Sequence, residues 1–280
     1  MKKIMLFFAV ATILAACNND NEVLNETQYI TEFKAVFGGA DTRMTAGASA
    51  AGLKFAWEDG DKLYVFQADD PSVFYKGYEY DASTKTFKLS SGYVAMVAGT
   101  KYFAVIKHET SPYFTIEGEE IQFKAKLYIS GDNDVTKIPL ISDVFTADAE
   151  GTIAAMHHTV GVVEVPVKLD AASTYTTLKD LGFSIAEGYA AGDFIATPAS
   201  PYFKEATNAD AKSTWANSVT ELKTTEATSI FIPVLPGTYT NPGLNYNFES
   251  KSRQKSLTGT LTVERGKVTK ITEVQTLTLN

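Results

Sequence analysis

The side chains that most often carry metal or nucleophilic chemistry are scarce in this 280-residue chain. The chain has one cysteine, Cys17, and three histidines, of which His157 and His158 are adjacent. A single cysteine excludes an intrachain disulfide and a zinc site built on cysteines. Neighbouring residues of a strand point to opposite faces, so the two histidines cannot easily hold one metal ion. We expect one of them to pack inward and the other to face solvent.

The acidic groups give no stronger sign of chemistry. The stretch 132–134 (DND) lacks the ligand count and the terminal glutamate of an EF-hand loop. The adjacent carboxylates at 69–70 and 119–120 could in principle serve a glycosidase, but such pairs usually face solvent. No nucleophile elbow, P-loop or dinucleotide-binding glycine motif occurs. We therefore expect no catalytic residue, no metal site and no cofactor.

The overall charge limits the class of partner. The chain carries 25 Lys and Arg against 33 Asp and Glu, which gives a formal net charge of −8. Phosphate recognition needs a basic surface, so nucleic acid is not expected as a partner. Hydrophobic residues make up 45% of the chain and aromatic residues 12%, which is enough to build a core and argues against wholesale disorder.

The N-terminus has the pattern of an export signal. Lys2 and Lys3 precede an uncharged run of thirteen residues, 4–16, which is too short for a stable membrane-spanning helix. Residues 14–17 (LAAC) resemble the lipobox of bacterial lipoproteins, in which the cysteine is lipidated and becomes the new N-terminus. We predict a signal peptide at 1–16, lipidation of Cys17 and a flexible polar tether at 17–28. The alternative is an ordinary signal peptide that happens to contain a cysteine.

The rest of the sequence is patterned for short strands. Period-two or β-branched and aromatic runs recur between Gly, Pro, Asn and Asp turn signals, at 31–37, 62–66, 101–106, 121–129, 159–169, 229–234, 257–263 and 268–274. This pattern predicts an all-β protein of the sandwich type. Short helical pieces are expected at most near 206–222, which is rich in Ala, Lys and Glu. A small and polar stretch at 146–155 suggests a division into domains at 29–150 and 151–280.

Several motifs occur in the order found in a known family. Residues 42–45 read TRMT and residues 57–66 read WEDGDKLYVF. They are followed by KYFAV at 101–105, MHHTVGVV at 156–163 and FIPVLPGTY at 231–239. With the lipobox in front, this order resembles the fimbrillin family, the lipoprotein pilins and pilus-like adhesion proteins of Bacteroidetes. The resemblance implies two tandem transthyretin-like Greek-key β-sandwiches and a protein that is not an enzyme.

The resemblance also implies a place and a way of assembly. The protein would be lipid-anchored in the outer membrane, exposed on the surface or in a fimbria. It would act as a pilus subunit or pilus-associated adhesin, with other pilus subunits, further copies of itself, or host glycans and proteins as partners. Assembly would proceed by strand exchange, with Arg43 as the candidate site for an Arg-specific protease.

The strand that such a cut would free is residues 29–37. Strand alternation places Phe33, Ala35 and Phe37 on one face and Lys34 and Val36 on the other. Two alternatives remain open at this stage. The strand could stay in place, as in an anchor subunit or a non-polymerising adhesin, or the protein could be a surface glycan-binding lipoprotein of a nutrient-uptake system.

Overall fold

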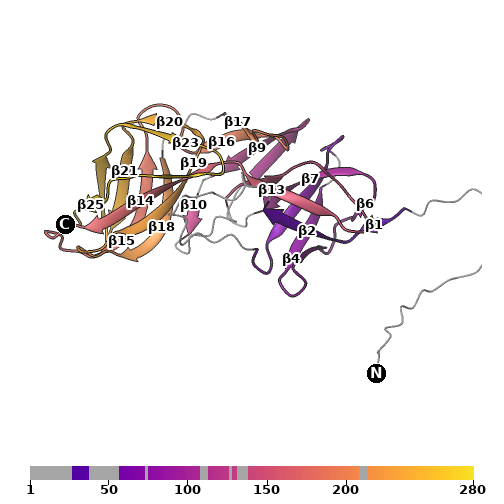
Figure 1. The fold of residues 1–280 in the computed structure, drawn as a ribbon, viewed down its shortest axis with the longest axis horizontal. Helices are drawn as coiled ribbons and strands as arrows, with labels where there is room; N and C mark the ends of the chain where they lie inside the picture. The colour runs from indigo at the N-terminus through magenta and orange to yellow at the C-terminus, as the bar shows by residue number, and fades with distance from the viewer. Residues whose placement is uncertain are drawn as a thin grey trace, which may run out of the picture.

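The computed structural model describes residues 27–37, 57–72, 75–107, 113–125, 128–130, 138–207 and 213–280. Within these ranges the protein is all-β, and no helix occurs. Figure 1 shows an elongated molecule with the early strands at one end and the late strands at the other. No helix in the described residues is long and apolar enough to cross a membrane.

The N-terminal end is a ring of seven strands that closes on itself. The order around the ring is β11-β13-β2-β5-β4-β3-β7, and β7 pairs again with β11. The strand bounds are β2 (Glu32–Phe37), β3 (Lys62–Gln67), β4 (Lys76–Asp81), β5 (Thr86–Leu89), β7 (Lys101–Lys107), β11 (Leu140–Ser142) and β13 (Ile153–His158). We call this ring the barrel. The two-residue strand β12 (Phe145–Thr146) also pairs with β7, and β1 (Tyr29–Ile30) pairs with β6 (Met96–Val97) beside the ring.

Turn chemistry explains two corners of the barrel. Before β3, the Asp61 carboxylate accepts a hydrogen bond from the Glu58 N–H at 2.8 Å, and Gly60 supplies the positive φ of 90° that the turn needs. Between β4 and β5, an Asp81 oxygen accepts from the N–H groups of Ser83 and Thr84 at 2.8 and 3.3 Å. The second set of bonds fixes the register of β4 and β5, which pair antiparallel on either side of that turn.

The C-terminal end is a sandwich of two main sheets. One sheet has the order β10-β18-β15-β21-β22, and the other places β19 and β24 on either side of β14, with β25 also paired to β14. Their bounds are β10 (Tyr128–Ser130), β14 (Gly161–Leu169), β15 (Thr177–Ser184), β18 (Ser213–Glu221), β19 (Thr228–Val234), β21 (Gly243–Phe248), β22 (Lys251–Ser256), β24 (Val268–Lys270) and β25 (Gln275–Leu277). A two-stranded sheet of β20 (Gly237–Thr240) and β23 (Thr260–Val263) adjoins it.

A third, four-stranded sheet joins segments from both halves of the sequence. Its order is β17-β16-β9-β8, with β8 (Tyr113–Glu117), β9 (Glu120–Ala125), β16 (Gly192–Ala196) and β17 (Phe203–Ala206). Strand pairings therefore cross residue 150, because β13 belongs to the barrel and β10 to the C-terminal sandwich. The apolar side chains form three clusters accordingly: one inside the barrel, one inside the C-terminal sandwich, and one that joins β3 and β7 of the barrel to β9, β16 and β19.

The expectation of helical pieces near 206–222 was wrong for the part of this segment that the structure describes. Residue 206 ends β17, and Ser213–Glu221 form β18, which pairs along its length with β15. Thr214 and Ala216 are buried in alternation, as a strand with one covered face requires. The ladder with β15 outweighs a composition that is only weakly helix-favouring.

Candidate functional site: the strand β2 and its seat

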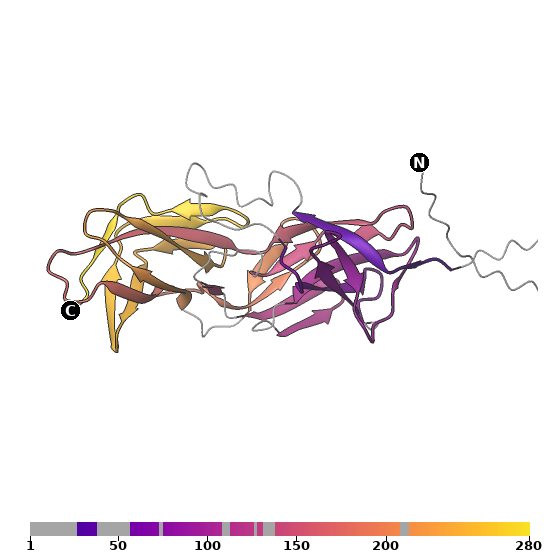
Figure 2. The ribbon, with the colours of Figure 1, turned by 90° about the horizontal axis from the view of Figure 1, so that it is seen from below.

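Strand β2 closes the barrel. It pairs in parallel with β13, where Lys34 to Phe37 lie opposite Ile153 to Met156, and antiparallel with β5, where Phe33 lies opposite Phe87. In Figure 2 the indigo β2 runs along one side of the barrel. Without β2 the ring would be interrupted between β5 and β13. We call the surface that these two strands and the barrel interior offer to β2 its seat.

The side chains of β2 alternate as the sequence pattern predicts. Phe33 is 2% exposed and Ala35 8% exposed, and Phe37 is half-buried at the end of the strand. Lys34 is exposed, and Val36 is 43% exposed on the outer face. The strand therefore presents an apolar face to the barrel core and a mixed face to the outside. This alternation fixes its register, because a slip by one residue would move the phenylalanines into water.

Phe33 lies among aromatic rings of the barrel core. Its ring centroid is 4.9 Å from that of Tyr78 in an edge-to-face arrangement and 5.6 Å from that of Phe87 in a stacked one. A third ring, Phe145 of β12, lies 6.1 Å away. Such arrangements are favourable beyond the area that they bury. Phe33 is therefore the deepest apolar anchor of β2 in its seat.

The far end of β2 is held by Trp57, which lies beyond residue 43 in the chain. The indole Nε1–H donates to the carbonyl oxygen of Ala35 at 2.8 Å, and the ring stacks on Phe37 with centroids 5.0 Å apart. Trp57 also meets Phe87 edge-to-face at 5.0 Å. Trp57 is a packing residue in front of a tight Asp-Gly turn. Its indole N–H gives it a second role, since it binds the backbone of β2.

The segment just before β2 is held by Tyr78 of β4. The Tyr78 hydroxyl donates to the carbonyl oxygen of Ile30 at 2.6 Å and accepts from the N–H of Met96 at 2.9 Å. Burial raises the pKa of Tyr78 to about 12, so the hydroxyl stays neutral and remains a donor. One buried hydroxyl thus connects β1, β4 and β6 at the point where the chain enters the barrel.

The other two predicted positions, Cys17 and Arg43, lie outside the described residues. Lipidation and cleavage therefore remain predictions from the sequence. The structure brings Phe33, Ala35 and Phe37 together on β2.

The sequence correctly predicted that one of the two adjacent histidines packs inward, but the prediction that the other faces solvent was wrong. Neither faces solvent, since His157 is 7% exposed and His158 is fully buried. Strand alternation correctly places them on opposite faces of β13, but both faces are covered. His158 lies near Phe37 on one face, with centroids 6.1 Å apart, and His157 stacks on Tyr202 on the other, at 4.1 Å. His157 is covered by Tyr202, which lies beside β17. A pattern in the sequence near residue 157 could not reveal this contact.

The acidic pairs lie in surface segments. Asp70 accepts a hydrogen bond from the Ser72 N–H at 3.3 Å within its own turn. Glu120 starts β9 and pairs with Lys204 of β17. Within the described ranges, no group of three or more His, Cys, Asp and Glu side chains is arranged to hold a metal ion.

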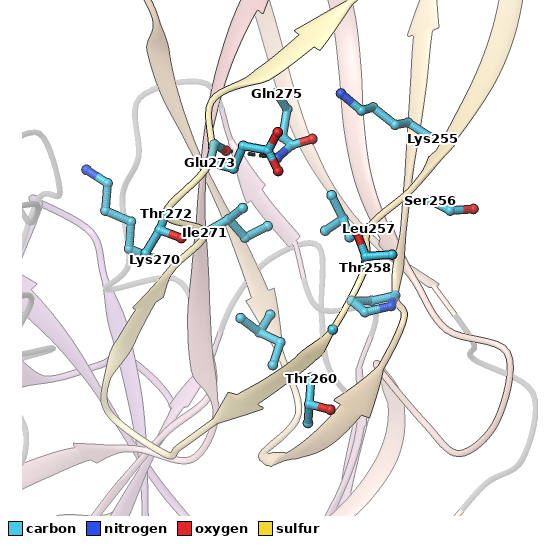
Figure 3. A pocket seen from close by; sticks show the side chains of 13 residues that line it. Lys255, Ser256, Leu257, Thr258, Thr260, Lys270, Ile271, Thr272, Glu273 and Gln275 are labelled. Atoms are coloured by element: carbon cyan, nitrogen blue, oxygen red, sulfur yellow. Dashed lines mark hydrogen bonds between the residues drawn. The ribbon is translucent and has the colours of Figure 1, made fainter.

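A cleft in the C-terminal sandwich has a volume of about 470 Å³. It lies between the segment from β22 to β23 and the segment from β24 to β25 (Figure 3). The ammonium group of Lys255 donates to the carbonyl oxygen of Thr276 at 3.3 Å, and that of Lys270 lies 3.1 Å from a Glu164 oxygen. Lys255 thus links β22 of one sheet to β25 of the other, whereas Lys270 and Glu164 pair within one sheet.

The tyrosines near 75–80 serve mainly as packing. Tyr75, 38% exposed, lies 4.4 Å from Tyr64 and 5.9 Å from Tyr93 between ring centroids. The ring of Tyr93 lies over Gly77, where a Cβ would be 2.8 Å from the ring and would displace it. Stacking on a glycan needs exposed aromatic rings, and in this cluster Tyr64 is buried and Tyr93 is partly buried.

Comparison with known proteins supports the fold. No family model matches the sequence, and no curated protein matches it either. Among solved structures, a "putative cell adhesion protein" from Bacteroides ovatus superposes with a TM-score of 0.53 at 12% identity, over 87% of this chain and 91% of that one. The chain shares the fold of that protein. At this identity the likeness concerns the fold alone.

Two further structures are similar over most of their length. A "putative cell adhesion protein" from Bacteroides fragilis has a TM-score of 0.46 at 14% identity, with 89% of this chain and 94% of that one covered. A "fimbrial protein" from Bacteroides vulgatus has a TM-score of 0.37 at 10% identity, with 86% and 92% covered.

Proposed function

We propose that this protein is a fimbrial or cell-adhesion protein of the bacterial surface, held in the outer membrane by lipid on Cys17. The proposal includes assembly by strand exchange after a cut at Arg43, with other pilus subunits or further copies of the chain as partners. We further propose that the two ends of the molecule correspond to two tandem transthyretin-like sandwiches. We assign the protein no catalytic role.

The observation that carries the proposal is the position of β2. The strand closes the barrel, yet it lies before Arg43 in the chain, so one cut there would separate it from every later strand. Its withdrawal would uncover Phe87 of β5 and Met156 of β13, both fully buried when β2 is present. Exposing a large apolar side chain costs roughly 1.5–3 kcal/mol.

The backbone of the seat supports the same conclusion. Without β2, β5 and β13 would each present a row of unpaired N–H and C=O groups, which is a template for another strand. An incoming strand would gain affinity from the main-chain ladder and specificity from alternate side chains that fill the places of Phe33, Ala35 and Phe37. A groove of this kind is a stable state only when it is filled.

The test is treatment of the purified protein with an Arg-specific protease. We expect a new N-terminus at Met44 and a ladder of heat-stable oligomers, both absent in an Arg43→Ala variant. A synthetic peptide of residues 29–37 added in excess should block the ladder, whereas the same peptide with Asp at position 33 should not. Clean cutting without oligomers would contradict the polymerising function and favour a strand that stays in its seat or an adhesin that does not polymerise.

A further inference from the structure

Four side chains meet where the parts of the molecule join. Asp143, between β11 and β12, and His157 of β13 belong to the barrel. Tyr202 precedes β17 of the four-stranded sheet, and Arg265 lies in the turn between β23 and β24 of the C-terminal end. The four residues are far apart in the sequence and come from three separate parts of the fold.

Their contacts form a continuous chain. The Tyr202 hydroxyl donates to one oxygen of Asp143, and His157 Nε2 lies 3.0 Å from the other. The rings of His157 and Tyr202 stack with centroids 4.1 Å apart and planes inclined by 14°. The Arg265 guanidinium lies over the Tyr202 ring, 4.6 Å from its centroid. Tyr202 therefore contacts the barrel through Asp143 and His157, and the C-terminal end through Arg265.

Because these contacts are buried, they hold the participating side chains in defined orientations. His157 and Tyr202 are each 7% exposed, so their polar atoms depend on partners in the protein more than on water. A stacked pair with a cation above it also requires a defined orientation of each plane. The surrounding apolar cluster packs the same parts together but fixes their relative angle less strictly.

The same strand connects these contacts to the seat of β2. His158 follows His157 on β13 and turns to the opposite face, where its ring lies nearly parallel to that of Phe37, at an angle of 18°. The carbonyl oxygen of His158 accepts a hydrogen bond from Arg265 Nη1 at 3.4 Å. Phe37 thus supports the residue whose backbone holds Arg265 over Tyr202.

We propose that Asp143, His157, Tyr202 and Arg265 form a latch that fixes the angle between the barrel and the C-terminal sandwich, and that Phe37 in its seat keeps the latch closed. When Phe37 is lost, β13 loses a neighbour, His158 loses its support, and Arg265 no longer stays over Tyr202. One part of this inference rests on the proposed function: in the cell, strand exchange would be the event that removes Phe37. The latch itself is a property of the intact chain.

The latch can be tested with spin labels on the full chain carrying Cys17→Ala. This substitution removes the one native cysteine, so that labels attach only at cysteines introduced elsewhere. Ala82→Cys in the barrel and Ala172→Cys in the C-terminal sandwich place labels on exposed alanines. Pulsed electron spin resonance then gives the distribution of distances between them. We expect a narrow distribution, broadened at least twofold by Tyr202→Phe, by Asp143→Asn and by Phe37→Ala.

The control is Tyr239→Phe, which removes a buried hydroxyl that contacts Leu235 O and Tyr189 O and none of the four latch residues; it should leave the width unchanged. Near-ultraviolet circular dichroism confirms that each variant is folded. An unchanged width in Tyr202→Phe and Asp143→Asn would overturn the latch. Broadening in those two but not in Phe37→Ala would overturn its coupling to β2. None of these outcomes depends on a cut at Arg43, so they are independent of the protease test.

Discussion

The indole of Trp57 holds the backbone of Ala35 across the position where we expect the chain to be cut. Its Nε1–H donates to the Ala35 carbonyl at 2.8 Å, while Arg43 lies between the two residues in the sequence. Cleavage at Arg43 would therefore sever the covalent link but leave this hydrogen bond and the stack with Phe37 in place. The release of β2 requires these contacts to break as a separate step.

Trp57→Phe should loosen β2 without emptying its seat. Phenylalanine keeps a ring against Phe37 but cannot donate to Ala35 O, which we expect to lower the free energy of unfolding by about 1 kcal/mol. Hydrogen exchange at the amides of β2 should accelerate, and oligomers should form faster after cleavage. The matched control is Trp215→Phe in β18, which should leave exchange in β2 unchanged. Equal exchange in both variants would show that Trp57 does not hold the strand.

Phe33→Ala should cost far more than a neighbouring substitution on the same strand. Phe33 is 2% exposed and packed against three rings, so its truncation should destabilise the protein by about 3–5 kcal/mol. Val36→Ala, on the outer face, should stay within about 1 kcal/mol. Urea unfolding followed by tyrosine and tryptophan fluorescence gives both values. Similar losses for the two variants would contradict the inward orientation of Phe33.

Tyr78→Phe should loosen β1, the segment through which the chain enters the barrel. The change leaves the Ile30 carbonyl and the Met96 N–H without their shared hydroxyl, and each is buried. We expect a loss of about 1–3 kcal/mol and faster proteolysis before residue 31. Tyr80→Phe on the same strand is the control, because Tyr80 is less buried and its ring contacts survive. Proteolysis at the same rate in both variants would mean that the hydroxyl does not secure this segment.

Much of the local structure was predictable from the sequence, and the closure of the barrel was not. The alternation in residues 31–37 and the Asp-Gly turn after Trp57 depend on neighbours in the chain, so local patterns indicated them. The ring closes because Ile141 of β11 pairs with Val105 of β7, and no local signal records a contact between segments so far apart. The sheet that joins β9 to β16 was missed for the same reason.

The histidines illustrate the same limit at the level of a site. Strand geometry, applied to two neighbouring residues, placed His157 and His158 on opposite faces. Whether each face is covered depends on Phe37 and Tyr202, which lie in other elements. A burial pattern can be derived from periodicity only when one face of a sheet is open to water, and β13 has no open face at these two positions.

Lowering the pH should destabilise the protein through His158. Burial above all, and then the charges of Arg265 and His157, lower the pKa of His158 to about 3, against about 6.5 in an unfolded chain. Between these values the unfolded state binds a proton that the folded state does not, so the free energy of unfolding falls as the pH falls. The contribution of His158 is complete above pH 6.5 and declines below it, by up to about 1.4 kcal/mol per pH unit for one proton.

The variant His158→Phe isolates this effect, because it keeps a ring beside Phe37 but cannot be protonated. We expect the free energy of unfolding, measured with urea between pH 5.5 and 7, to depend more steeply on pH for the natural chain than for the variant. At the acidic end the difference in slope should correspond to the uptake of close to one proton on unfolding. The other titrating groups are common to both chains and cancel in the difference. Parallel curves over this range would show that His158 takes up a proton equally in the folded and unfolded states, and would contradict its burial between Phe37 and the latch.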